Sequence, residues 1–161
     1  MERIEHPIAP VFDSRSRVLI LGSFPPVRSR QAPFFYGHPQ NRFWQVLAVL
    51  LGCSLPQTTE EKRAMLLANC IALWDTIASC EIEGSSDSSI RSVVPNDLTP
   101  ILRTGDIRQI FCNGRTSYTL FMRHLAPTLG RSAVCLPSTS PANAQWRLEQ
   151  LTEAWSILKT R

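Results

Sequence analysis

Short apolar runs alternate with amphipathic stretches along this chain. The runs predict buried strands, since each is four to six residues long and ends at a glycine, proline or polar residue: 17–21, 71–74, 107–112 and 133–136. Apolar residues at three- to four-residue spacing predict helices over 41–51, 58–69, 118–125 and 148–158. This alternation indicates an α/β protein, a three-layer α/β/α sandwich with a central four-stranded parallel sheet.

Local signals mark where several elements begin and end. Gly52 is a stop for the first helix, and Thr58 with Glu61 forms a capping box that opens the second. Asn96 has the character of an N-cap for a short helix ending near 104–105. Residues 79–92 are rich in serine and lack periodicity, so a surface loop is expected there. No repeat or low-complexity linker is present, and we expect one domain over residues 1–161.

The predicted sheet also predicts where a ligand binds. In parallel α/β folds, ligands lie at the carboxyl ends of the strands. Four places qualify in this sequence, and its polar residues and glycines gather at them: residues 22–25, 75, 113–114 and 138–141. The functional site is therefore expected along this edge of the sheet.

Charge adds a candidate partner. The net charge is +4, both ends of the chain are basic, and fifteen of the seventeen basic residues are arginine. Arginine presents a planar fork of donors that suits phosphate, although a solvated basic surface explains the bias equally well. No apolar run approaches the ~18 residues that a membrane span needs. The acidic first residues lack the apolar core of a signal peptide, so we expect a cytoplasmic protein without membrane contact.

Several chemistries lack their sequence signatures. The five cysteines include no C-x-x-C pair and the three histidines are dispersed, so no metal site is expected. The glycine-rich dinucleotide motif, the P-loop and the G-x-S-x-G elbow are all absent. The remaining candidates are polar and aromatic residues near the predicted strand ends.

Three segments carry a resemblance to a known family. They read LGSFP at residues 21–25, FFYGHPQNRFW at 34–44 and LPSTSPAN at 136–143. Together they resemble the uracil-DNA glycosylase superfamily, and most closely its hypoxanthine-DNA (deoxyinosine) glycosylase branch. The resemblance runs through nearly the whole chain. It implies the sandwich already predicted, hydrolysis of the bond between a damaged base and deoxyribose, a DNA partner, and no cofactor.

The resemblance also implies residue roles. Asn41 falls at the family's catalytic asparagine, where its amide could hold the attacking water; capping a helix is the alternative. Asp75 could accept the N–H of hypoxanthine or uracil, with capping of a turn as the alternative. Phe24 and Tyr36 are the preferred surfaces for stacking an everted base, and core packing is the other interpretation. The expected base pocket comprises Gly22, Ser23, Phe24, Tyr36, His38, Asp75 and Asn113.

DNA contacts are expected in both motifs. The second motif is predicted to precede a helix whose first turn includes Pro141, so that its hydroxyls and free N–H groups suit phosphate, unless Ser140 is simply an N-cap. Arg115 and Arg147 are further candidates, and the stretch 84–91 also resembles the deoxyinosine branch. The predicted DNA-binding set is Pro25, Arg42, Ser138, Thr139, Ser140, Pro141, Ala142 and Asn143.

Departures from the family pattern narrow the chemistry. Phe24 stands where mismatch-uracil relatives carry asparagine, and Leu136 stands where the main uracil enzymes carry a catalytic histidine. Both lysines, Lys62 and Lys159, lie outside the motifs, which argues against a Schiff base and a strand-nicking step. We therefore expect a monomeric, monofunctional glycosylase. The alternatives are a catalytically silent protein that binds lesions or mismatches, and an enzyme acting on free nucleosides or nucleotides.

Overall fold

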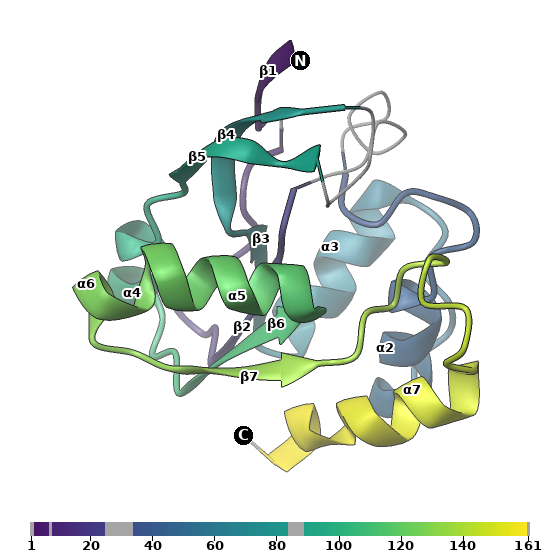
Figure 1. The fold of residues 1–161 in the computed structure, drawn as a ribbon. Helices are drawn as coiled ribbons and strands as arrows, with labels where there is room; N and C mark the ends of the chain where they lie inside the picture. Colours follow the sequence, from purple (N-terminus) through teal and green to yellow (C-terminus); the bar gives the residue numbers. More distant parts are fainter. Residues whose placement is uncertain (1, 7, 25–33, 84–88, 161) are drawn as a thin grey trace.

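A parallel sheet of four strands forms the centre of the molecule (Figure 1). The computed structural model describes residues 2–6, 8–24, 34–83 and 89–160. The strands lie in the order β3-β2-β6-β7 and span β2 (Val18–Gly22), β3 (Ile71–Asp75), β6 (Gln109–Asn113) and β7 (Ala133–Leu136). All four were predicted, with ends that differ by two residues or fewer. The predicted α/β class is confirmed.

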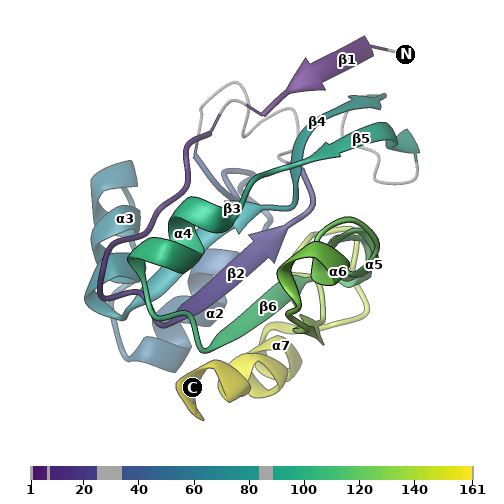
Figure 2. The same ribbon diagram turned by 90° about the vertical axis from the view of Figure 1, so that its left-hand side faces the viewer.

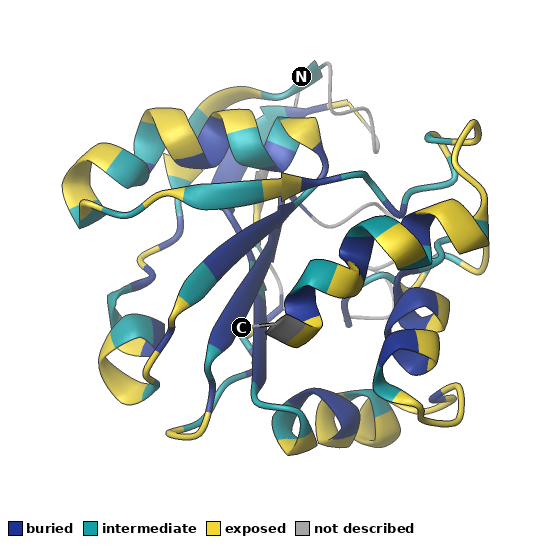
Figure 3. Cartoon of the chain, turned by 90° about the horizontal axis from the view of Figure 1, so that it is seen from below, coloured by how far each residue is buried: buried dark blue, intermediate teal, exposed yellow. Residues whose placement is uncertain are grey.

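Helices cover both faces of this sheet, because successive strand residues point to opposite sides. Val18 and Ile20 pack with α2 (Phe43–Leu51), α3 (Thr59–Ala68) and α7 (Leu148–Trp155). A 3₁₀ turn, η2 (Ser156–Thr160), extends α7. Leu19 and Leu21 pack with the other layer, which holds α4 (Thr99–Thr104), α5 (Arg115–His124) and α6 (Ala126–Leu129). Figure 3 shows the result, buried strands between helices that are exposed on their outer sides.

The predicted helix signals hold at two ends and fail at one. Gly52 ends α2 in the left-handed conformation that favours glycine, and Thr58 and Glu61 form the predicted capping box of α3. Asn96 is not an N-cap, because α4 begins three residues later. Its buried side-chain amide instead donates to the carbonyl oxygens of Asp75 at 2.8 Å and Ile77 at 3.1 Å.

A second, antiparallel sheet corrects the expected loop over residues 79–92. It pairs β1 (Glu2–Glu5), β4 (Ile77–Ile82) and β5 (Arg91–Pro95) in the order β1-β4-β5. The predicted loop fails because β4 buries Ile77, Cys80 and Ile82 in a small apolar cluster, although serines and acidic residues interrupt its pattern. Part of the serine-rich stretch, 84–88, lies outside the described residues.

The smaller sheet stands beyond the carboxyl end of β2 (Figure 2). Only Thr76 separates β3 from β4, so the chain runs directly from the central sheet into the smaller one. β1 and β4 therefore cover the end of β3, which is buried (Figure 2). Among the described residues, no helix is both long and apolar enough to cross a lipid bilayer.

Candidate active site

The four strand ends singled out by the sequence lie along one edge of the central sheet. Gly22 is the register partner of Asp75 on the neighbouring parallel strand, and Asn113 is the partner of Leu136. Gly114, which follows Asn113, lies so close to Ser138 that an added Cβ would be 3.1 Å from the serine Cβ. This edge therefore gathers residues of both motifs.

Asn41 is held at this edge by Thr139 from the second motif. Its Oδ1 accepts the backbone N–H of Phe43 at 3.0 Å and the hydroxyl of Thr139 at 2.8 Å. The buried Thr139 is held in turn by Asn113, whose Nδ2 donates to its Oγ1 at 3.0 Å and whose Oδ1 accepts its N–H at 3.1 Å. We call these three residues the amide network.

The amide network fixes which way Asn41 faces. Because Oδ1 receives two donors, the Nδ2 group of Asn41 points away from Thr139, and no acceptor for it lies among the described residues. The N-cap of α2, which begins at Phe43, is Arg42, so Asn41 precedes the helix without being its N-cap. The arrangement presents two N–H donors to an incoming oxygen, of a water molecule, a sugar or a base.

A buried His–Asp pair closes the end of β3. Nε2 of His6 lies 2.8 Å from Oδ2 of Asp75, and the two side chains are 3% and 5% exposed. Nδ1 of His6 accepts the N–H of Ile8 at 3.2 Å, which places the imidazole proton on Nε2, facing the carboxylate. Sequence reasoning missed His6, because a lone histidine outside the motifs carries no signal until β1 pairs with β4.

Tyr36 and Gly22 complete this second cluster. A Cβ on Gly22 would lie 2.3 Å from Oδ1 of Asp75 and 2.9 Å from the Tyr36 hydroxyl, so only glycine fits. Tyr36 has a left-handed backbone, with φ of 54°, and its ring stacks on Phe43 at 4.1 Å between centroids. Its buried hydroxyl has no hydrogen-bond partner among the described residues. We call His6, Asp75, Tyr36 and Gly22 the carboxylate cluster.

The Tyr36 hydroxyl stays protonated in this setting. Burial raises its pKa well above the ordinary value, the negative charge of Asp75 raises it further, and the amide of Asn113 acts in the opposite direction. Tyr36 is thus a neutral donor next to a carboxylate acceptor, with the bare backbone of Gly22 beside both. The influence of Asn113 also shows that the two clusters adjoin.

The other predicted pocket residues have structural partners. The Phe24 side chain is buried with Ile77 and Cys80, and its ring meets His6 edge-on at 5.7 Å, which is the core-packing interpretation. Nδ1 of His38 accepts the N–H of Gln40 at 3.1 Å, so this imidazole shapes the turn before Asn41. The carbonyl of Ser23 accepts the N–H of Ile77. Pro25 lies outside the described residues.

The expected helix start at Pro141 is wrong, because α7 begins at Leu148. Residues 138–147 form a loop of tight turns whose hydroxyls accept backbone N–H groups: Oγ of Ser138 from Ser140, and Oγ of Ser140 from Ala142, both at 3.1 Å. Pro at 141 and the serines around it favour such turns as readily as a helix start, which explains the error. Phosphate binding at a helix N-terminus has no basis here.

Arg42 braces the 138–147 loop. Its guanidinium donates to the carbonyl oxygens of Ser140 at 2.9 Å, Asn143 at 3.1 Å and Trp146. These bonds use the terminal nitrogens that a DNA phosphate would need. The geometry therefore supports a positioning role for Arg42, in place of the direct DNA contact predicted from the sequence.

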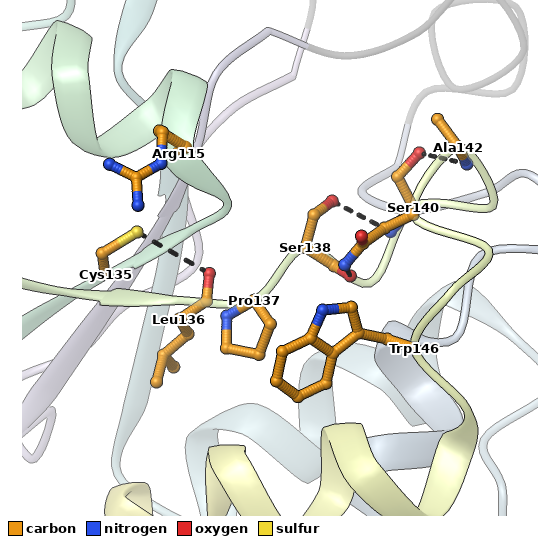
Figure 4. Close-up of a pocket in the computed structure, with 9 residues that line it drawn as sticks. Arg115, Cys135, Leu136, Pro137, Ser138, Ser140, Ala142 and Trp146 are labelled. Carbon is orange, nitrogen blue, oxygen red and sulfur yellow. Dashed lines mark hydrogen bonds between the residues drawn. The ribbon is translucent and has the colours of Figure 1, made fainter.

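A cavity of about 560 Å³ opens beside the same loop (Figure 4). It is lined by Arg115, Cys135, Leu136, Pro137, Ser138, Ser140, Ala142, Asn143 and Trp146. Within the described part of the chain, no three histidine, cysteine, aspartate or glutamate side chains are grouped as metal ligands.

The fold is that of an α/β protein, and the residues gathered at the carboxyl edge of its sheet carry amide, carboxylate and phenol groups. The profile described as the uracil DNA glycosylase superfamily matches residues 9–159, nearly the whole chain. The chain belongs to this superfamily.

Individual relatives agree with the assignment. A protein of Methanosarcina acetivorans named hypoxanthine DNA glycosylase is 31% identical over 153 residues, covering 92% of this chain and 94% of that one. A protein of the same name from Methanosarcina barkeri is 31% identical over 152 residues, covering 91% and 92%. The solution NMR structure of a Methanosarcina acetivorans protein, described as a candidate uracil DNA glycosylase, superposes with a TM-score of 0.79 at 29% identity over 96% of this chain and 98% of that chain.

Proposed function

We propose that this protein removes hypoxanthine from deoxyinosine in DNA by hydrolysing the N-glycosidic bond, which initiates base excision repair. Membership of the uracil DNA glycosylase superfamily makes the chain a DNA N-glycosylase that acts on deaminated bases. Hypoxanthine as the base is supported by the names of the two relatives that align over most of the chain. The observation that carries the proposal is the donor face of Asn41, held by Thr139 beside the carboxylate cluster.

Hydrolysis needs the target nucleotide to leave the helix and enter a pocket. As the bond between C1′ and the base breaks, its electron pair leaves with the base, the water oxygen bonds to C1′, and one proton of that water ends on the departing base. The Nδ2 group of Asn41 donates to a lone pair of that water and holds it in place, while the water's other lone pair faces the sugar carbon. The network behind Asn41 keeps the amide from rotating, since both acceptor positions on Oδ1 are filled.

The carboxylate cluster matches the edge of hypoxanthine. Because His6 occupies Oδ2 of Asp75, Oδ1 remains to accept the N1–H of the base, and the Tyr36 hydroxyl donates to the adjacent O6. The bare backbone of Gly22 lets the base approach both groups. Adenine presents an acceptor at N1 and a donor at N6, so its pattern is reversed and the same groups reject it.

The site is built within one chain, which supports a monomer. Each group with a proposed role, from His6 to Thr139, belongs to the same copy. The five cysteines form no disulfide among the described residues, which is typical of a reducing compartment and supports a cytoplasmic location. The two lysines lie outside both clusters, which supports a monofunctional hydrolase that forms no Schiff base.

Duplexes that each carry one altered base test the proposal. Purified protein is incubated in excess with duplexes containing deoxyinosine, deoxyuridine or only normal bases, and abasic sites are read as alkali-labile strand breaks. We expect breaks at deoxyinosine and none in the normal duplex. Binding without breaks would instead favour the silent lesion-binding alternative, and cleavage of free deoxyinosine with no salt-sensitive affinity for duplex would favour a nucleosidase.

A further inference from the structure

The cavity beside the 138–147 loop joins an aromatic surface to a cation. In Figure 4, Arg115 and Cys135 lie at one end, Trp146 lies at the other, and Pro137 and Ser138 lie between them. The Trp146 side chain is among the few large apolar groups exposed in the described residues, with 37% of its surface accessible. An indole face open to solvent is the surface on which nucleobases stack.

The cation end of the cavity belongs to a stretch of the sequence that lacks acidic residues. From Ile107 to Leu148 the sequence contains no aspartate or glutamate, yet it contains five arginines: Arg108, Arg115, Arg123, Arg131 and Arg147. This stretch includes α5, β7 and the whole 138–147 loop. Arg115 is exposed and forms no ion pair or hydrogen bond among the described residues, so its donors are available to a phosphate.

We propose that this cavity is a second nucleotide site, which holds a nucleotide of the DNA strand other than the one excised. Its base stacks on Trp146 and its phosphate lies on Arg115. The site is separate from the carboxylate cluster proposed to read the excised base, because the cavity faces β7 and the loop, whereas Gly22 and Asp75 of that cluster lie at the ends of β2 and β3. Ser138 and the loop connect the two, so a strand bent around the loop reaches both. The inference rests on the proposed function for its ligand, DNA.

The Cys135 thiol provides a readout inside the cavity. It is exposed and lines the cavity beside Arg115, while Cys53 is equally exposed at the far end of α2, in a different hollow. Burial raises the pKa of the Cys135 thiol and the Arg115 charge opposes this, so alkylation is followed at alkaline pH, where more of the thiol is ionised. The two rates are measured in one sample by peptide mapping.

The first experiment measures protection of Cys135 by DNA. The duplex carries a tetrahydrofuran abasic analogue, which no glycosylase can turn over, with ten base pairs on each side. We expect saturating duplex to slow alkylation of Cys135 at least fivefold and that of Cys53 less than twofold. Shortening one flank to a single nucleotide should remove the protection, and the flank that matters identifies the side of the lesion that fills the cavity. Equal rates for Cys135 with and without full-length duplex would overturn the proposal.

The second experiment separates stacking from simple charge attraction. Loss of one stacked base reduces affinity by roughly fivefold or more, so we expect Trp146→Ala to weaken binding of the full duplex by that factor and Trp146→Phe to restore it. Arg115→Gln should weaken binding and reduce the salt slope by about one, whereas Arg103→Gln, the same charge change on α4, should do neither. Neither Trp146→Ala nor Arg115→Gln should alter binding of the short-flank duplex.

The outcomes distinguish this site from the proposed function. If Trp146→Ala has a normal melting temperature and binds the duplex with wild-type affinity, the cavity contacts only the DNA backbone. That result would overturn the nucleotide site. Failure to excise hypoxanthine, with Cys135 still protected by duplex, would overturn the substrate assignment and leave this site standing. Excision of hypoxanthine without protection of Cys135 would support the substrate assignment and overturn the second nucleotide site.

Discussion

The amide network and the carboxylate cluster lie at one edge of the sheet and differ in which of their hydrogen-bonding groups have partners. In the amide network, Thr139 and both acceptor positions of Asn41 Oδ1 are satisfied, while the Nδ2 group of Asn41 has no acceptor among the described residues. In the carboxylate cluster, a buried hydroxyl is left without a partner beside a half-used carboxylate. In our proposal, the amide network holds one donor in place for the reaction, and the carboxylate cluster offers a donor and an acceptor to the base. Reaction and recognition then depend on different residues, and substitutions should separate them.

The largest effect should come from Asn41→Ala. It removes the donor proposed to hold the attacking water, and we expect the single-turnover rate of hypoxanthine release to fall about a hundredfold or more. Affinity for the duplex should stay close to wild type, because the loop contacts remain. Asn69→Ala is the matched control. It removes a hydrogen bond from a side-chain amide to the carbonyl oxygen of Met65, far from the site, and should leave the rate unchanged. An unchanged rate in Asn41→Ala would remove this residue from the mechanism.

Thr139→Val should have the next largest effect. It keeps the shape of the side chain but removes the hydroxyl that donates to Asn41 and accepts from Asn113. Two partly buried amides lose a partner, so we expect the free energy of unfolding to drop by about 1–3 kcal/mol and the rate to fall roughly tenfold. Thr152→Val, which removes a hydroxyl bond within α7, should lower stability without a comparable loss of rate. Equal losses of rate in both variants would show that Thr139 acts through stability alone.

Asp75→Asn should change which base is preferred. The new amide turns an N–H group toward the N1–H of hypoxanthine, which cannot accept it. Uracil carries a second carbonyl on the other side of its N–H and can still accept one bond, so we expect the inosine-to-uracil rate ratio to fall about fivefold. Asp106→Asn removes the same charge at an exposed position and should leave the ratio unchanged. A constant ratio in Asp75→Asn would count against Asp75 as the residue that reads the base.

The smallest change, Tyr36→Phe, should move stability and activity in opposite directions. Removing a buried hydroxyl that has no partner should raise the free energy of unfolding by about 1 kcal/mol, which corresponds to roughly 2–4 °C in Tm. Excision of hypoxanthine should fall a few-fold, because the donor to O6 is lost. Thermal unfolding and single-turnover assays measure the two, and Tyr118→Phe is the control. A less stable Tyr36→Phe protein would mean that the hydroxyl is satisfied in the fold.

Residue patterns predicted the central sheet well and the smaller sheet not at all. Strands such as β2 are buried on both faces and read as continuous apolar runs, which few other structures produce. In β4, Ser79 and Glu81 interrupt the apolar positions, and its strand character depends on pairing with β1, whose residues lie 74 to 80 positions before their partners. A sheet held together by distant pairing leaves little trace in a local window.

The same distinction applies to the site. Asp75 and Asn113 were singled out because the ends of parallel strands fall on one edge, and Asn41 because of its place in a family motif; the structure brings all three to that edge. The roles of Arg42 and His6 depend on partners that are 98 and 69 residues distant, and nothing in the neighbouring sequence indicates them. Sequence therefore located the edge, and the contacts across the fold show which atoms remain free.

These long separations have a consequence for how the protein matures. Asn41 meets Thr139 across 98 positions, so its side chain cannot be set until β7 and the loop after it have been synthesised and docked. Partly made chains that already hold β2, β3 and β6 would carry the carboxylate cluster with no fixed amide beside it. Excision of a base is thus confined to molecules whose last strand is in place, and catalytic competence would emerge as one of the final events of folding.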